Sequence, residues 1–300
     1  MATSRSGPRA GGGWTIAALA AAAVLALGSS GGTAGAGAPA DDALHDLHQG
    51  LFSRAEERLR GVVSADPADP EARFRVAFVR WWRIVLAESD RGEVDVEFDA
   101  AIEAALLAGE RRLAERPGSA RALASVGGAY ILRAHVEAIR KRYFRAAQEA
   151  RRGKKRLEAA LEKDPGLDTA LFALGAYNYY ADKVPLIVKG LRALLFLPGG
   201  DAERGLRQIR TVATSDTPFR TDARLLLAMI CGAREEAAYR AALGHLRAAL
   251  ADNPGSPVIG AAIGELQMRL GEYGEAARTF EAALEGASGP ERDQIGRAHV

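Results

Sequence analysis

The stretch IGAAIGELQMRLGEYGEAARTFEAALE, residues Ile259 to Glu285, carries the pattern that decides the fold. Apolar and small residues recur in it every three to four positions, which predicts two amphipathic helices. Gly271 and Tyr273 lie between them and indicate a turn. In the first helix Gly264 lets a second helix approach closely, and in the second helix Phe280 fills the space beside it. The stretch is therefore predicted to fold as a helix–turn–helix unit.

The second-helix pattern recurs along the chain, and most copies end at a proline. Because proline cannot continue a helix, the prolines at 67, 117, 165 and 254 mark helix ends. The spacing is 50 residues from Pro67 to Pro117 and 48 from Pro117 to Pro165. Strand-like alternation of β-branched residues is absent. The chain is therefore predicted to be all-α, with lengthened units in its middle.

These units resemble the tetratricopeptide repeat (TPR), a helix–turn–helix unit of 34 residues. The resemblance rests on Gly264, Ala276, Phe280 and Ala283 and on the matching positions of the earlier units. It implies a right-handed α-solenoid of about six TPR-like repeats over residues 41–294, with the first helices lining a concave side. Because each unit buries its apolar faces by stacking on its neighbours, we expect one elongated array. The block from Gly175 to Leu206 is also similar to blocks of uncharacterised exported bacterial TPR proteins.

One of the long units contains an apolar insertion, Leu186 to Leu197 (LIVKGLRALLFL), between Pro185 and Pro198. It is predicted to form a helix, after which Asp201 caps the next one. This inserted helix is either a buried plug or a face for a partner or a membrane.

The first 40 residues are predicted to be an export signal and its cleavage region. Arg5 and Arg9 precede an uncharged apolar run of 14 residues, Trp14 to Leu27, which is short for a membrane span. Overlapping A-x-A sites follow, ending at 36, 38 and 40. We expect a periplasmic or extracellular protein, and the alternative is an uncleaved anchor.

The last six residues, Ile295 to Val300 (IGRAHV), resemble a sequencing adapter translated in one frame. We expect residues 295–300 to be non-native and the natural chain to continue beyond Gln294.

Composition and motifs point away from catalysis. The chain is 48% hydrophobic and 26% charged, values typical of a folded core, and its formal net charge of +2 provides no field that attracts nucleic acid. Cys231 is the only cysteine, which excludes internal disulfides and zinc sites built on paired cysteines. Nucleophile-elbow, phosphate-loop, zinc-protease and dinucleotide motifs are absent. We expect a protein that is not an enzyme, holds no cofactor and binds no nucleic acid.

The histidines offer little chemistry. His45 and His48 share a helical face, but their nearest further ligands are the aspartates at 41, 42 and 46. We expect a solvated face rather than a metal site. His135 and His245 are single and are expected to pack or to lie on the surface.

Charge is distributed unevenly. Residues 140–156 hold nine basic side chains against Glu149 alone, and the preceding unit is acidic from Glu88 to Glu103. One hypothesis is that the basic segment binds an anion or an acidic partner, through a face that contains Arg140, Lys141, Arg145 and Arg152. The other is that the two segments face each other or are simply solvated.

Aromatic residues supply the main candidate site. Phe74, Phe78, Trp81 and Trp82 lie in one first helix, and Tyr179 and Tyr180 are equivalent two units later. By resemblance to TPR proteins, this side faces the concave groove, where aromatic rings suit peptide capture. The structural alternative is that they pack under the inserted helix as core.

The sequence therefore predicts an exported, non-catalytic scaffold that binds a protein or peptide in its groove through Phe78, Trp81, Trp82, Tyr179 and Tyr180. The alternative is a binding protein for a small apolar or anionic ligand, held between the groove and the inserted helices. An enzyme would require a convergent set of histidine, carboxylate or metal ligands. The oligomeric state stays open.

Overall fold

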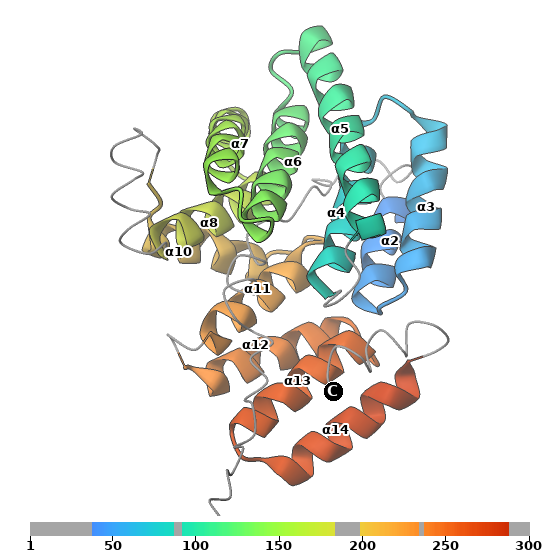
Figure 1. Ribbon diagram of the computed structural model, residues 1–300, viewed down its shortest axis with the longest axis vertical. Coiled ribbons are helices and arrows are strands. Elements are labelled where there is room, and N and C mark those ends of the chain that lie inside the picture. Colours follow the sequence, from blue (N-terminus) through green and yellow to red (C-terminus); the bar gives the residue numbers. More distant parts are fainter. Residues whose placement is uncertain (1–37, 87–91, 184–198, 234–236, 288–300) are drawn as a thin grey trace, which may run out of the picture.

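The computed structural model describes residues 38–86, 92–183, 199–233 and 237–287, and this part of the chain is built of α-helices without a strand (Figure 1). The predicted all-α class is confirmed. The export signal apart from its last residues, the inserted helix Leu186–Leu197 and the suspected tail 295–300 lie outside the described residues. The helices are α2 (Ala38–His48), α3 (Phe52–Ala65), α4 (Pro70–Leu86), α5 (Gly92–Glu115), α6 (Ala120–Ile139), α7 (Tyr143–Lys163), α8 (Asp168–Lys183), α10 (Ala202–Thr214), α11 (Arg220–Gly232), α12 (Tyr239–Asp252), α13 (Pro257–Arg269) and α14 (Tyr273–Gly286).

Successive helices pair as antiparallel hairpins, and local signals place their ends. Helices α3, α5, α7 and α12 each end two residues before a proline, as the sequence predicts. The carboxylate of Asp201 caps α10 by accepting a hydrogen bond of 2.9 Å from the backbone N of Arg204. The middle units are long because α5, α6 and α7 have 24, 20 and 21 residues, against 13 or 14 in each helix from α10 onward.

Glycines set how closely the paired helices approach. In the α13–α14 hairpin, a Cβ added to Gly264 would lie 2.7 Å from the ring of Phe280, so the predicted contact is present. In the α8–α10 hairpin, a Cβ at Gly205 would lie 2.5 Å from the carbonyl oxygen of Gly175 and 2.7 Å from the backbone N of Tyr179. The obstructing atoms belong to backbone, so they cannot move aside as a side chain does.

We therefore expect Gly205→Ala to lower the free energy of unfolding by about 1–3 kcal/mol, because it forces α8 and α10 apart. Gly244→Ala is the matched control in α12, where an added Cβ meets nothing within 4 Å. That change should raise stability by about 0.5–1 kcal/mol, because alanine is the better helix former. Urea denaturation measures both, and equal effects of the two changes would refute the close approach.

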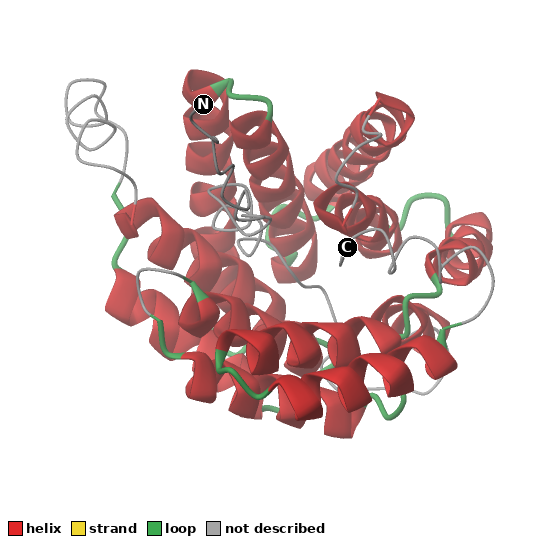
Figure 2. Ribbon diagram, turned by 60° about the horizontal axis from the view of Figure 1, so that its bottom comes forward, coloured by secondary structure: helices red, strands yellow, loops and turns green. Residues whose placement is uncertain are grey.

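The superhelix curves so strongly that its first hairpin contacts its last two (Figures 1 and 2). His48 Nε2, at the end of α2, lies 2.9 Å from Asp222 Oδ1 in the first turn of α11. Ser256 Oγ, just before α13, donates a hydrogen bond of 2.5 Å to the backbone O of His48. We call these three residues the clasp. The elongated array expected from the repeats is thus corrected, since residues 174 and 208 positions apart touch.

A cation–π contact supports the same closure. The Arg75 guanidinium, from α4, lies 5.8 Å from the ring centroid of Phe219, at the start of α11. Both side chains are almost fully buried. Arg75 also pairs with Asp41 at 2.8 Å and with Glu71 at 2.9 Å, so its burial is electrostatically compensated.

Candidate functional site

The aromatic cluster of α4 is mostly core. Phe74 and Phe78 are 0% exposed and Trp81 is 1% exposed. The rings of Phe78 and Trp81 stack with centroids 5.7 Å apart. Trp81 Nε1 donates a hydrogen bond of 2.7 Å to Nδ1 of His135, which comes from α6. Trp81 therefore joins α4 to α6, and both Phe78 and Trp81 are core residues, whereas the inserted helix under which they were expected to pack lies outside the described residues.

The other three predicted groove residues keep only limited access. Trp82 is partly buried and packs against both hydrophobic clusters, one running from α2 to α11 and one from α11 to α13. Tyr179 is buried and packs edge-to-face on the partly buried Tyr180, with ring centroids 5.1 Å apart. Burial, with a smaller contribution from Tyr179, raises the pKa of the Tyr180 phenol well above its usual range. Among the five, Trp82 and Tyr180 alone retain accessible surface.

Ion pairs link α5, α6 and α7, and one of them, Arg140–Asp99, joins the basic segment to the acidic one, in agreement with one of the two hypotheses. Arg140 lies 3.0 Å from Asp99, and Arg133 lies 2.8 Å from Glu103. Arg156 of α7 lies 2.7 Å from Glu110. Three of the cations of the basic segment converge on one buried carboxylate, Glu137, at N–O distances of 3.3, 3.4 and 3.9 Å: Arg140, Arg142 and Arg145.

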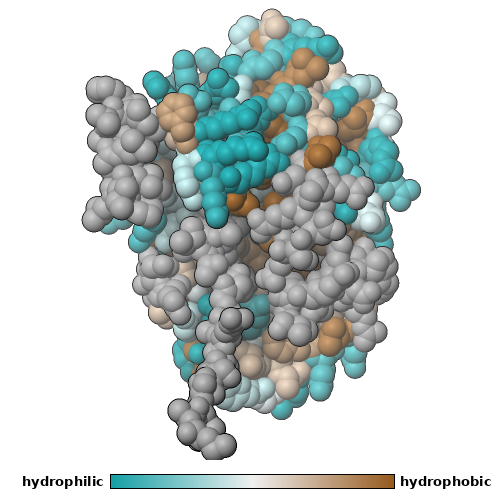
Figure 3. Space-filling model, viewed as in Figure 1, coloured by the Kyte–Doolittle hydropathy of each residue, from teal (hydrophilic) through white to brown (hydrophobic). Residues whose placement is uncertain are grey.

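These pairs leave the outer face of α7 strongly positive. The buried side of α7 consists of small or apolar residues and one carboxylate, namely Ala146, Glu149, Gly153, Leu157 and Ala160. The opposite side is an exposed line of residues, which we call the α7 stripe: Phe144, Arg145, Gln148, Arg151, Arg152 and Lys155. Their spacing of i, i+1, i+4, i+7, i+8 and i+11 places them on one helical face. Hydrophilic residues gather over α6 and α7 in Figure 3.

Two of the four charges in the stripe are compensated. Arg145 shares Glu137, and Arg152 lies 3.3 Å from Glu149. Within the described part of the chain, Arg151 and Lys155 have no ion-pair partner. Phe144 is 58% exposed at the amino end of the stripe, next to the similarly exposed Tyr143.

The structure places the four predicted basic residues in different settings. Arg145 and Arg152 belong to the α7 stripe, whereas Arg140 is largely buried by Asp99 and Glu137. Lys141 is exposed in the turn before α7, where its φ of 61° reverses the chain. Sequence reasoning missed Phe144, Arg151 and Lys155. The small and apolar residues Ala146, Gly153 and Leu157 define the buried face of this helix, and the opposite face contains the three missed residues.

The remaining titratable candidates do not converge. His45 is exposed, whereas His48 is buried in the clasp, so the two do not form a pair. Partial burial, followed by the charges of Arg210 and Arg224, lowers the pKa of His245. Cys231 lies on α11 and is half-buried. In the described ranges no three histidine, cysteine or acidic side chains form a metal-binding group.

The described helices include none that is long and apolar enough to cross a bilayer.

Comparison with known proteins agrees with the hairpin architecture. Residues 233–292 match the family model described as tetratricopeptide repeat. A solved thermophilic TPR protein from Thermus thermophilus is 17% identical, with 87% of this chain and 97% of that chain covered and a TM-score of 0.32. The human IFIT1 dimer with PPP-AAAA is 14% identical over 80% of this chain and 70% of that chain, with a TM-score of 0.28. No curated protein matches the sequence significantly. Residues 233–292 therefore match the tetratricopeptide repeat, in the region where α12, α13 and α14 follow one another as antiparallel helices.

Proposed function

We propose that this protein is an exported, non-catalytic interaction scaffold, and that it binds an acidic segment of a partner protein along the α7 stripe. The observation that carries the proposal is the line of exposed cations on one face of α7, beginning at an exposed phenylalanine. The TPR-like fold supports the scaffold role, because such repeats present long surfaces to other proteins.

The charge of this surface favours an anionic partner. Arg145, Arg151, Arg152 and Lys155 span about 16 Å of helix, given a rise of 1.5 Å per residue. Glu137 and Glu149, the carboxylates beside them, are buried and already shared with arginines. A row of carboxylates on a partner would complement the remaining positive charge and speed association.

The two aromatic side chains at the end of the stripe favour a protein over a simple ion. Phe144 and Tyr143 are 58% and 60% exposed and would lose water-accessible apolar surface on docking. Anchors of this kind account for much of the affinity of protein interfaces. The groove site predicted from the TPR resemblance is less favoured, because Phe78, Trp81 and Tyr179 are buried within the protein.

Export is supported by the sequence of residues 1–40, with Arg5 and Arg9 before the apolar run. It would place both the scaffold and its partner outside the cytoplasm. Amino-terminal sequencing of the protein recovered from its host tests this step: a mature chain that begins near residue 41 is expected, and a chain that retains Trp14–Leu27 would contradict cleavage.

The stripe can be tested with the triple change Arg145→Gln, Arg151→Gln and Lys155→Gln. We expect it to weaken binding to the partner about tenfold, since exposed charge pairs contribute about 0.2–1 kcal/mol each. Added salt should also weaken the binding of the partner to the wild-type protein, because it screens the same charges. The partner is first captured by a photo-crosslinking residue at position 144, and its affinity is then measured by titration with the purified acidic segment.

Two controls make the result decisive. The matched triple change is Arg207→Gln, Arg240→Gln and Arg247→Gln, which removes three exposed cations elsewhere and should leave binding unchanged. A crosslinker at the exposed Tyr273 of α14 should not capture the same protein. If both triple variants lose partner binding equally, the α7 stripe is not the binding surface. Binding to phosphatidylglycerol vesicles without any captured acidic protein would refute the choice of a protein partner.

A further inference from the structure

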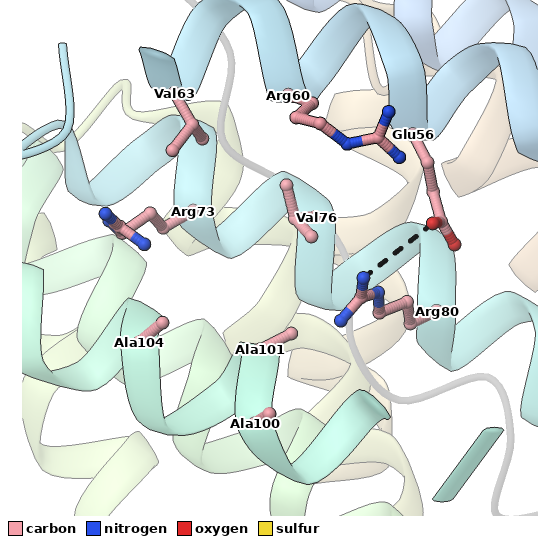
Figure 4. Close-up of a pocket in the computed structure, with 9 residues that line it drawn as sticks. All are labelled: Glu56, Arg60, Val63, Arg73, Val76, Arg80, Ala100, Ala101 and Ala104. Carbon is pink, nitrogen blue, oxygen red and sulfur yellow. Dashed lines mark ion pairs between the residues drawn. The ribbon is translucent and has the colours of Figure 1, made fainter. Parts of the chain in front are cut away.

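A small cavity lies between α3, α4 and α5, far from the stripe in sequence and on different helices (Figure 4). Its volume is about 230 Å³. Its apolar lining consists of five short side chains: Val63, Val76, Ala100, Ala101 and Ala104. The alanines stand at i, i+1 and i+4, so they share one face of α5. The alanine side chains are short, so they leave a space that longer side chains at these positions would fill.

The polar lining is cationic. Arg60 from α3 and Arg73 and Arg80 from α4 border the cavity, and Glu56 is the one acidic residue among the lining side chains. Figure 4 shows the alanines of α5 on one side of the space and Arg60 with Glu56 on the other. Three guanidinium groups against one carboxylate leave an excess of two positive charges.

Backbone oxygens hold two of the three arginines in place. Arg73 Nε donates a hydrogen bond of 2.7 Å to the backbone O of Pro67, and Arg80 Nη1 donates one of 2.9 Å to the backbone O of Glu97. Backbone oxygens fix the orientation of a guanidinium but bring no full negative charge.

Carboxylates compensate the cavity only in part. Glu56 lies 3.8 Å from Arg80 and 3.2 Å from Arg83, which lies outside the cavity, so one carboxylate is shared between two cations. Arg80 Nε is buried and makes no hydrogen bond within the described residues, and it lies 4.0 Å from the Glu97 carboxylate. Arg60 is exposed and has no ion-pair partner there. N–H donors therefore remain available at the cavity.

We propose that this cavity binds a small organic acid, with its carboxylate between Arg60 and Arg80 and its short aliphatic body against the alanines of α5, toward Arg73 (Figure 4). Guanidinium groups match a carboxylate in charge and in fork geometry. The methyl and isopropyl groups of the lining offer an apolar surface to the rest of the ligand. The volume is below the 300–1,000 Å³ typical of sites for drug-sized molecules, which selects a short chain. The site is independent of the α7 stripe.

The test is a titration of the full-length protein with 4-methylpentanoate, followed through the Nε–Hε nuclear magnetic resonance signals of its arginines. We expect saturable shifts at Arg60, Arg73 and Arg80 and none at Arg207, an exposed arginine of α10. The neutral analogue 4-methylpentanamide should bind at least tenfold more weakly, since it lacks the charge. Inorganic phosphate, which lacks the apolar body, should also be weaker.

Two variants separate charge from shape. Arg60→Gln removes an exposed, unpaired cation and should weaken binding about five- to tenfold without affecting the fold. Ala104→Leu fills the cavity and should abolish the shifts, while an unchanged melting temperature shows that the protein is intact. Arg207→Gln is the charge control and should bind as the wild type does. Shifts that do not saturate, equal binding of the amide or of phosphate, or unchanged binding by Ala104→Leu would each overturn the proposal.

Discussion

Trp81→Ala is expected to lower the free energy of unfolding by about 3–5 kcal/mol, the range for removal of a buried large aromatic side chain. The indole is 1% exposed and packs between Phe78 and Trp82, with ring centroids 5.7 and 5.3 Å away. Truncation leaves a cavity between α4 and α6 and also removes the N–H donor to His135. Since single domains are stable by about 5–15 kcal/mol, much of the chain could unfold at growth temperature. Urea denaturation monitored by circular dichroism measures the change.

Graded controls separate packing from binding. Trp81→Phe keeps most of the ring but loses the hydrogen bond, so it should cost about 1–3 kcal/mol. Tyr273→Ala, at a side chain that is 65% exposed, should change stability by less than about 0.5 kcal/mol. A Trp81→Ala protein that stays as stable as the wild type yet loses a bound partner would overturn the structural role and restore the groove hypothesis.

His48→Ala is expected to be the second most damaging change, because it opens the clasp. Asp222 is 0% exposed, and its carboxylate accepts the His48 Nε2 hydrogen bond while Oδ2 has no hydrogen-bond partner among the described residues. Removal of the imidazole leaves the buried Asp222 carboxylate without its partner, and the loss of one side of a buried pair costs about 3–5 kcal/mol. The Asp222 carboxylate also lies at the favourable amino end of α11, in its first turn.

The clasp variant has a matched control on the same helix. His45→Ala removes an exposed histidine of α2 and should be nearly neutral. The double change His48→Leu and Asp222→Leu should recover much of the loss, because an apolar pair leaves no buried charge unpaired. Hydrogen exchange of the α2 and α3 amides should accelerate in His48→Ala alone. Equal stability of His48→Ala and His45→Ala would show that other contacts hold the superhelix closed.

Local signals were enough to predict the hairpins. Pro67, Pro117 and Pro165 end helices for a steric reason that acts within one turn, and the Asp201 carboxylate caps α10 by accepting a hydrogen bond from the backbone N of Arg204. The glycine and phenylalanine of the last hairpin pack as their spacing predicts, since they lie 16 residues apart in a unit with a short turn. The pairing of acidic and basic segments was one of two hypotheses, and the Arg140–Asp99 contact agrees with it.

The candidate sites were less accessible to such reasoning. An aromatic stripe has the same spacing whether it faces a groove or a core, and the burial of Trp81 depends on where α6 brings His135. The α7 stripe and the cavity depend on side-chain register across several helices. For the cavity, the alanines of α5 matter only because α3 and α4 place Arg60 and Arg80 opposite them.

The amino-acid sequence thus specifies the helices, their ends and their pairing into TPR-like hairpins, because proline, glycine and apolar spacing act over a few residues. The superhelical curvature comes from the packed structure, since it accumulates from small rotations between successive hairpins that no single segment encodes. That curvature brings His48 to Asp222, 174 residues away, and closes the first hairpin onto the last two. The packing of neighbouring hairpins places the most conspicuous aromatic residues inside the protein, while the surface that we propose for a partner lies on the outer face of α7.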